Sequence, residues 1–336
     1  MIACPRTDAP YVQLLNSSLR SLGVKVAELE SFGRQYPYSI SQFFAFRSRG
    51  YELLHLHWVP FRYERILKLV RNATEEFNVK VVWTVHNILP HEPQFADDLA
   101  VMRAVADWAD LGIVHSDRTR AVVSEKLSSD LRLVTIPHGH FNTLARSVPA
   151  EEARKRMGIG EDKIALLLFA PDRRNKGVDT FIEVLEKLPP NYVGILAGRC
   201  PDREIRGEIE RARKRLGPRL ITDLRFIPDE EVPAYFSAAD IYFIPYKWIT
   251  TSGSVFFAFA YKKPVVTTPE GHLPDIIESG ENGYLVSDVE EMVEVIGSID
   301  RARAKEMGSK AHEMAAKYDW DGIAKRTVEA YRSVVS

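Results

Sequence analysis

The segment 244–286 constrains the fold of this chain more than any other part of the sequence. It contains an apolar run, 255–260, that directly follows the polar sequence Thr-Thr-Ser-Gly-Ser at 250–254. A Lys-Lys-Pro sequence ends this run, and a short apolar stretch follows at 265–268. Polar residues before an apolar run mark the start of a helix, and a proline after it marks the end. The segment therefore predicts a strand, a helix and a strand of an open α/β sheet, and then a second helix over 273–277.

The start of the first predicted helix is a candidate anion site. A helix N-terminus has backbone N–H groups without intrahelical partners and carries about half a positive charge. Both properties favour the binding of phosphate. An ordinary, well-capped helix explains the same sequence, so this segment by itself leaves both interpretations open. The residues at this terminus are Thr250, Thr251, Ser252, Gly253 and Ser254.

Length and composition restrict the classes of protein. A chain of 336 residues predicts two domains rather than one. The formal net charge of −1 argues against bulk nucleic-acid binding. The two cysteines, Cys4 and Cys200, lack the spacing of a disulfide or a metal site. Because the sequence has neither a signal-peptide pattern nor an apolar run of the roughly 18 residues that span a membrane, we expect a soluble, cytoplasmic protein.

The first half of the chain alternates strand and helix patterns. A strand, a helix and a strand are predicted at 1–5, 11–22 and 24–27. The turn between them lacks the G-x-G-x-x-G pattern of dinucleotide-binding proteins, which argues against a dehydrogenase. Cationic residues then follow on the helix predicted from residue 61, namely Arg62, Arg65 and Lys68. A solvated helix face explains them, and weak contact with a membrane surface is the alternative.

Histidines gather at the ends of the predicted strands. The strand at 53–58 places His55 and His57 on one face, because side chains alternate along a strand. Two such histidines can bind a metal, but no third ligand is evident, so we prefer a strand end beside a cleft. His86 follows the strand predicted at 79–85, and further strands are predicted at 110–116 and 132–136. Functional side chains of α/β proteins collect at such strand ends.

The second half begins with an unbroken apolar strand at 164–169, which is typical of a parallel sheet covered on both faces. The turn after it contains Arg173, Arg174 and Lys176. Three crowded cations favour an anion as their partner, whereas a solvent-exposed basic loop is the alternative. Further strands are predicted at 192–198, 225–229 and 239–244, and a last helix ends near residue 335.

Several motifs together resemble a family of glycosyltransferases. They are LHLHW at 54–58, HNILPHE at 86–92, IPHGH at 136–140, DRRNKG at 172–177 and ENGYLV at 281–286. The chain is similar to GT-B glycosyltransferases of family 4 (glycosyl transferases group 1), and to the subgroup that has an HNxxPHE-type motif in its first domain. The resemblance implies two Rossmann-like domains that face each other across a cleft. The implied boundaries are an acceptor-binding domain at 1–145, a nucleotide-sugar-binding domain at 146–315, and a helix at 316–336 that packs back on the first domain.

The resemblance also implies a reaction, the transfer of a sugar from a UDP- or GDP-linked donor to a hydroxyl group of a glycan or glycolipid precursor. Negative charge develops on the departing phosphate, so catalysis needs cations placed there in advance. The implied catalytic residues are Arg173, Lys176 and His86, and His86 would hydrogen-bond a sugar hydroxyl or relay the acceptor proton. The implied donor-binding residues are Gly198, Arg199, Pro228, Thr250, Thr251, Ser252, Gly253 and Ser254. The implied acceptor-binding residues are Arg6, Asp8, Tyr11, His57, Trp58, Asn87, His91 and Glu92.

The chain departs from the family at one pair of positions. Many members carry two glutamates there, the second of which binds the ribose, whereas this chain has Ile249 and Phe257. The identity of the donor therefore cannot be transferred, although the family favours retention of configuration. The resemblance implies no bound metal and no cofactor besides the nucleotide sugar, and leaves open a peripheral membrane contact and the oligomeric state. A sugar-nucleotide epimerase, a phosphorylase and an inactive nucleotide-sugar-binding protein remain as alternatives.

Overall fold

A computed structural model of the chain describes residues 2–5, 9–29, 50–58, 64–90, 95–128, 130–146 and 148–335. The chain divides into two compact units. Unit 1 consists of Met1–Gly139 and Tyr318–Ser336, and unit 2 of His140–Lys317. Each unit contains a six-stranded sheet, and all neighbouring strands in the described residues run parallel. The predicted α/β class with two Rossmann-like domains is thereby confirmed.

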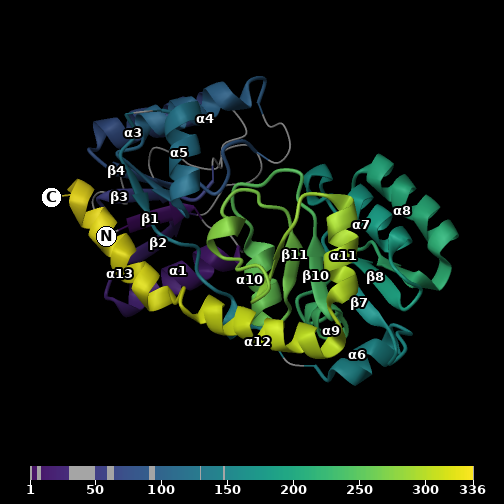
Figure 1. Cartoon of the computed structure of the whole chain (residues 1–336). Coiled ribbons are helices and arrows are strands. Elements are labelled where there is room, and N and C mark those ends of the chain that lie inside the picture. Colours follow the sequence, from purple (N-terminus) through teal and green to yellow (C-terminus); the bar gives the residue numbers. More distant parts are fainter. Residues whose placement is uncertain are drawn as a thin grey trace. The chain divides into compact units, whose positions relative to one another are not determined.

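Unit 1 has three layers, with a sheet of strand order β2-β1-β3-β4-β5-β6 in the middle. In Figure 1, α3, α4 and α5 cover one face of this sheet, and α1 and α13 cover the other. The strands are β1 (Ile2–Pro5), β2 (Val26–Leu29), β3 (Leu53–Leu56), β4 (Lys80–Thr84), β5 (Leu111–Val114) and β6 (Leu133–Thr135), and the helices are α1 (Pro10–Ser21), α3 (Glu64–Glu76), α4 (Asp98–Trp108), α5 (Asp117–Lys126) and α13 (Trp320–Val335).

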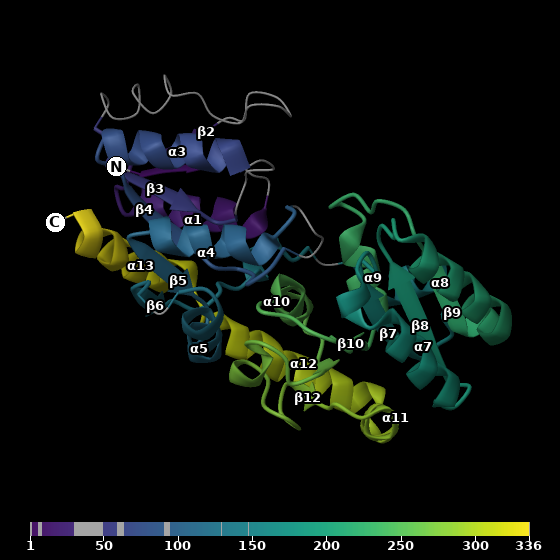
Figure 2. The same ribbon diagram turned by 90° about the horizontal axis from the view of Figure 1, so that it is seen from above.

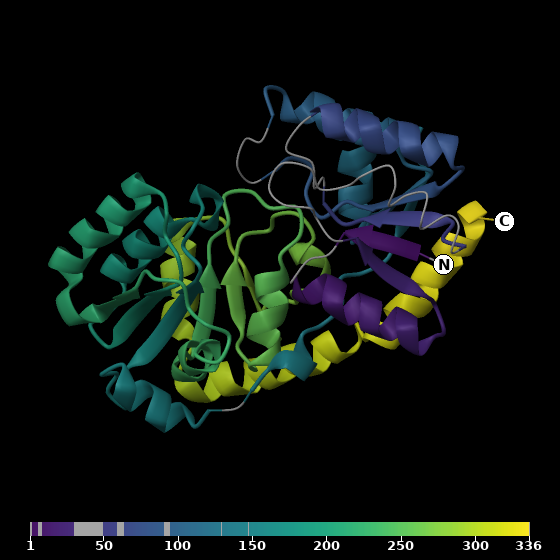
Figure 3. The ribbon, with the colours of Figure 1, turned by 180° about the vertical axis from the view of Figure 1, so that it is seen from behind.

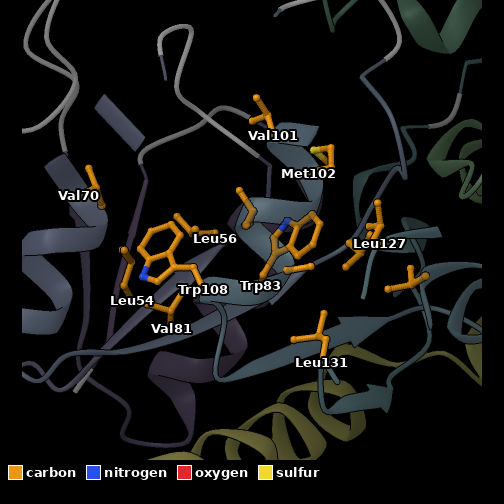
Figure 4. Close-up of a cluster of buried hydrophobic side chains, with 14 of the residues drawn as sticks. Leu54, Leu56, Val70, Val81, Trp83, Val101, Met102, Trp108, Leu127 and Leu131 are labelled. Atoms are coloured by element: carbon orange, nitrogen blue, oxygen red, sulfur yellow. The ribbon is translucent and has the colours of Figure 1, made fainter. Parts of the chain in front are cut away.

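Apolar side chains fill both faces of the sheet of unit 1. Trp83 of β4 and Trp108 of α4 lie in the cluster beneath the outer helices, which Figure 4 shows together with Val70 of α3. On the opposite face, α1 buries Val12, Leu15 and other residues at helical spacing. Figure 3 shows α1 and α13 side by side, so the C-terminal helix completes the first unit rather than the second.

Unit 2 has the strand order β12-β11-β10-β7-β8-β9, with α7 and α8 side by side in Figure 2. Its central strand β7 contains only apolar residues, and all but its last residue are buried, as expected for a parallel strand covered on both faces. The strands are β7 (Ile164–Phe169), β8 (Tyr192–Ala197), β9 (Leu220–Asp223), β10 (Ile241–Ile244), β11 (Val265–Thr267) and β12 (Gly283–Leu285), and the helices are α6 (Ala150–Arg156), α7 (Val178–Lys187), α8 (Arg203–Leu216), α9 (Val232–Ala238), α10 (Gly253–Ala260), α11 (Val289–Ser298) and α12 (Arg301–Ala316).

Two predicted elements of unit 2 are wrong. The strand predicted at 225–229 is an irregular segment, since β9 ends at Asp223 and the side chain of Phe226 is 65% exposed. The helix predicted at 273–277 is a single 3₁₀ turn, Leu273–Asp275, because the backbone leaves helical geometry at Ile276, where φ is −124°. Among the described residues, no helix is both long and apolar enough to cross a membrane.

Candidate functional site

In unit 2, the polar residues that follow two neighbouring strands are joined into one structure. Strands β7 and β10 pair directly, so the loops after them emerge side by side. The N–H of Lys247 donates to the carbonyl of Asn175 over 2.8 Å, and the Asn175 amide donates to the carbonyl of Trp248 over 3.0 Å. Gly177 has a left-handed conformation, and a Cβ atom added there would overlap the carbonyl oxygen of Pro245. Glycine is therefore required for this close approach.

The three cations after β7 have carboxylate partners within unit 2. Arg174 pairs with Asp202 at 3.2 Å and also with Glu204. Lys176 pairs with Asp172 at 3.0 Å, and its ammonium donates to the carbonyl of Ala170 over 2.6 Å. Burial lowers the pKa of Lys176, an effect that Asp172 partly opposes. Crowding by itself therefore does not require an external anion, because carboxylates of unit 2 lie beside these cations.

Arg173 differs from the other two cations. Its side chain is 38% exposed, and the Nε–Oδ2 distance to Asp172 is 3.6 Å, which is longer than a hydrogen bond. Asp172 is also shared with Lys176. The guanidinium of Arg173 thus retains donors for an incoming anion.

The N-terminus of α10 lies after β10, as the sequence predicts. The hydroxyl of Tyr246 lies 2.9 Å from that of Ser252 and 3.0 Å from that of Ser254. The backbone N–H of Ser252 already donates to Nε2 of His272 over 2.9 Å, so it is not free for phosphate. Helix geometry leaves the N–H groups of Gly253 and Ser254 as the donors at this terminus.

The other predicted donor residues follow several strands. Gly198 directly follows β8, and a Cβ atom added there would lie 2.7 Å from Cα of Ala170, so Gly198 is close to the loop after β7. Thr250 accepts the N–H of His272 at its carbonyl over 3.1 Å, and the Thr251 hydroxyl is buried without a partner among the described residues. Arg199 is exposed after β8, and Pro228 follows β9 at the sheet edge, so β7 and β8 separate Pro228 from the strand before α10.

In unit 1, five buried histidines lie at the carboxyl ends of four adjacent strands. Tyr11 of α1 lies among them, with its ring centroid 4.8 Å from that of His86. Trp58 stacks on His86 with the centroids 4.7 Å apart and the planes inclined by 19°. The histidines are His55, His57, His86, His115 and His138.

Hydrogen bonds connect some of these imidazoles and leave others open. Nδ1 of His115 lies 2.9 Å from the carbonyl oxygen of Ile136, and Nε2 of His115 lies 3.2 Å from Nδ1 of His86. His55 is bonded to the hydroxyls of Tyr331 at 2.6 Å and Thr84 at 2.8 Å. Among the described residues, both ring nitrogens of His57 and the Nε2 of His86 have no hydrogen-bond partner.

Four imidazoles of this cluster, those of His55, His57, His86 and His115, are neutral at neutral pH. Burial lowers the pKa of His55 to about 3 and that of His115 to about 4. Burial, followed by the neighbouring imidazoles, lowers the pKa of His57 and His86 well below 6.5. A group that resists protonation accepts a hydrogen bond better than it stores a proton, so hydrogen bonding is favoured over proton relay for His86.

The metal alternative for His55 and His57 has no support, because both nitrogens of His55 are engaged with hydroxyls. In the part of the chain that the structure describes, no group of three potential ligand side chains is arranged to hold a metal ion. Asn87 is half-buried after β4, and Lys68 is exposed on α3. The predicted acceptor residues Arg6, Asp8, His91 and Glu92 lie outside the described residues, as do Arg62 and the side chain of Arg65.

Four residues of these sites had no assigned role in the sequence. His115 and His138 each follow a strand of unit 1, whereas Tyr246 and His272 organise the terminus of α10. Their position just after a predicted parallel strand was the available signal. The partners of His115 and His272 lie 20 or more residues away in the sequence, and the local sequence pattern does not contain them.

Comparison with known proteins agrees with this architecture. Residues 164–299 match the family model described as glycosyl transferases group 1. The alpha-maltose-1-phosphate synthase of Mycolicibacterium smegmatis is 23% identical over 288 residues, which cover 77% of this chain and 74% of that protein. Among solved structures, a sucrose-phosphate synthase from Thermosynechococcus elongatus has a TM-score of 0.78 at 21% identity, covering 99% of this chain and 98% of that chain. The Anabaena protein Alr3699/HepE, solved in complex with UDP-glucose, has a TM-score of 0.76 at 19% identity and covers 99% of each chain.

The structural likeness shows the GT-B fold, and the family match shows a glycosyl transferases group 1 domain in unit 2. The predicted class of enzyme, a glycosyltransferase, is confirmed. The finer subgroup with the HNxxPHE-type motif stays a prediction.

Proposed function

We propose that this glycosyltransferase takes its sugar from a nucleoside-diphosphate sugar held by unit 2, and transfers it to a hydroxyl group of a glycan or glycolipid precursor held by unit 1. The observation that carries the proposal is the pairing of an available cation, Arg173, with the open N-terminus of α10, on loops that follow neighbouring strands. A diphosphate needs this combination of positive charge and N–H donors. We further propose that the chemistry needs no bound metal and retains the anomeric configuration.

Several residues of unit 2 stabilise the departing nucleotide diphosphate, each in a different way. Arg173 binds the diphosphate directly, and one charge-assisted contact contributes about 1.5–3 kcal/mol. Lys176 adds its charge from the base of the loop, where Ala170 and Asp172 hold it. Gly253 and Ser254 direct two N–H groups at the developing negative charge, which lowers the barrier to departure of the nucleotide.

The ribose is recognised differently from the family pattern. Phe257 stands at the position of the ribose-binding glutamate and packs against Phe141, with the ring centroids 4.6 Å apart. This apolar pair offers no acceptor for ribose hydroxyls. We therefore propose that UDP and GDP are both candidate nucleotides, with the backbone and the diphosphate contacts as the main source of affinity.

Unit 1 suits a sugar with exposed hydroxyl groups. Trp58 and Tyr11 supply aromatic faces and edges, and aromatic rings pack well on the apolar faces of sugars. The unpartnered nitrogens of His57 and His86 are available to hydroxyl groups. This arrangement supports a carbohydrate acceptor, and the membrane contact of α3 stays a prediction.

The diphosphate assignment is tested by calorimetric titration of UDP and GDP in the presence of EDTA. Arg173→Ala should weaken the binding of the nucleotide about 10- to 100-fold, because a charge-assisted contact of about 1.5–3 kcal/mol is lost. Arg174→Ala is the matched control, since the neighbouring arginine is already paired with Asp202 and Glu204. Equal affinities in the wild type and Arg173→Ala, or loss of all binding on adding EDTA, would refute the assignment.

Two further readouts separate the proposed reaction from its relatives. Incubation with UDP-sugars without an acceptor should leave the sugar unisomerised, whereas an epimerase would convert it. The anomeric configuration of the transferred sugar, read from proton NMR coupling constants, decides between retention and inversion.

A further inference from the structure

A chain of hydrogen bonds in unit 1 determines the protonation pattern of His86. The register of β4 and β5 pairs Thr84 with Ile113, and two residues further along each strand stand His86 and His115. Their ring nitrogens, Nδ1 of His86 and Nε2 of His115, are 3.2 Å apart. The other nitrogen of His115, Nδ1, lies 2.9 Å from the carbonyl oxygen of Ile136 just after β6. This row of hydrogen bonds begins at the backbone carbonyl of Ile136, continues through the ring of His115 and ends at the ring of His86, whose remaining nitrogen is Nε2.

The donor and acceptor roles along this chain follow from elementary chemistry. A carbonyl oxygen only accepts, so Nδ1 of His115 carries a proton. A neutral imidazole has one N–H, so Nε2 of His115 is an acceptor and Nδ1 of His86 is the donor. His86 has then used its only N–H, and its Nε2 carries a lone pair. Burial, which favours the neutral form of both rings, supports this sequence of roles.

The lone pair of His86 has no partner among the described residues. The ring is held in orientation by Trp58, which stacks on it, and by Tyr11, whose ring meets it edge-on at 86°. A buried acceptor kept without a partner in the free protein indicates a ligand that brings a donor.

We propose that His115 is a positioning residue, which fixes His86 as the Nδ1–H tautomer so that Nε2 accepts a hydrogen bond from a hydroxyl group of the substrate. The ligand class rests on the proposed function, whereas the tautomer does not. It follows that Nε2 of His86 selects for a substrate group that donates a hydrogen bond, which is a hydroxyl or another O–H or N–H group. A substrate in which a fluorine or a methoxy group replaces that hydroxyl offers no donor and loses this contact.

The tautomer is measurable without any substrate. In the full-length protein labelled with ¹⁵N-histidine, long-range proton–nitrogen correlation spectra distinguish the protonated from the unprotonated ring nitrogen of each residue. The resonances of His86 are assigned by their loss in His86→Gln. We expect Nδ1 of His86 to be protonated and Nε2 to be unprotonated in the wild type. A protonated Nε2 of His86 would overturn the proposal, whether or not the His115 variants fold.

Three variants test the role of His115. In His115→Leu the acceptor for His86 is lost, so the spectrum of His86 should change to a mixture of tautomers or to the Nε2–H form. In His115→Gln the side-chain amide supplies both an acceptor and a donor, so the Nδ1–H form should be restored. His55→Gln is the matched control, since it removes another buried histidine whose partners are Tyr331 and Thr84. An unchanged His86 tautomer in His115→Leu would refute the role of His115.

A second readout separates this proposal from the proposed function. UDP titrated into His115→Leu should bind with the affinity of the wild type, because the diphosphate residues belong to unit 2. If the tautomer is as expected but neither UDP nor GDP binds the wild type, the proposed function fails while the role of His115 stands. If the nucleotide binds but His86 is the Nε2–H tautomer, the role of His115 fails while the proposed function stands.

Discussion

Acidification should destabilise unit 1 strongly, because four of its buried histidines must remain neutral in the folded state. Each of these histidines has a folded-state pKa below its ordinary value of 6.5. At a pH between the folded and unfolded values, the unfolded chain therefore binds more protons than the folded chain. Stability is complete above about pH 6.5 and is lost as the pH falls below it.

The magnitude follows from the linkage between proton binding and unfolding. One pH unit below 6.5, each histidine that stays neutral in the folded state reduces the free energy of unfolding by about 1.4 kcal/mol. Four such residues together give about 5 kcal/mol between roughly pH 7.5 and 5.5, which is comparable with the whole stability of an ordinary domain. Of the aromatic groups packed against them, burial raises the pKa of Tyr11, so it stays neutral throughout this range.

Urea unfolding followed by tryptophan fluorescence measures this effect. Four of the five tryptophans belong to unit 1, and Trp248→Phe removes the one in unit 2. The free energy of unfolding should fall by about 5 kcal/mol over the stated range, and the slope should decrease by about a quarter in His55→Gln, because one of four proton-binding sites is removed. A change of less than about 1 kcal/mol in the wild type would refute the conclusion that these imidazoles are neutral in the folded unit.

Two further predictions concern unit 2. Gly177→Ala should destabilise unit 2 and weaken UDP binding, because the added Cβ atom would overlap the carbonyl oxygen of Pro245. Gly158 also has a positive φ but open space around it, so Gly158→Ala should lower the free energy of unfolding by only about 1–2 kcal/mol. Urea unfolding and calorimetry compare the two variants, and equal effects on both properties would contradict the close approach of the two loops. Arg154→Met should destabilise unit 2 by about 3–5 kcal/mol, because Asp240 loses its buried partner at 2.9 Å and keeps only the more exposed Arg301 at 3.2 Å. The carbonyl oxygens of Gly160 and Lys163 lose their donor as well. Arg215→Met, which breaks an exposed pair with Glu186, should lower the free energy of unfolding by at most about 1 kcal/mol. A similar decrease in both variants would argue against the burial of the Arg154 pair.

The elements that sequence reasoning located best are those that a single local pattern determines. The bounds of β7 agree with the predicted strand, because an unbroken run of six apolar residues is typical of a parallel strand covered on both faces. The start of α10 was located by the polar residues before its apolar run. In contrast, the strand expected at 225–229 was inferred from a short apolar sequence, and the exposed side chain of Phe226 shows that no sheet covers it.

The candidate site was only partly predictable for a different reason. The sequence placed Arg173 and Arg174 in one loop, but it did not distinguish the available arginine from the one that Asp202 and Glu204 occupy. The same holds for His115, whose role depends on the strand register that places it opposite His86. Such pairings join residues that are far apart in the chain. A single sequence without a fold does not show which of several possible partners a given side chain contacts.

The charges of the two sites restrict which part of a substrate each can bind. In unit 1, burial keeps the imidazoles of His57 and His86 neutral, so they offer no positive charge to compensate a buried phosphate. What they offer is hydrogen bonding, and His86 in the tautomer set by His115 can only accept at its open nitrogen. In unit 2, Arg173 and the N-terminus of α10 supply charge and N–H donors together. These charges support the part of the proposed function that assigns the diphosphate to unit 2 and an uncharged, hydroxyl-bearing group to the histidine cluster of unit 1.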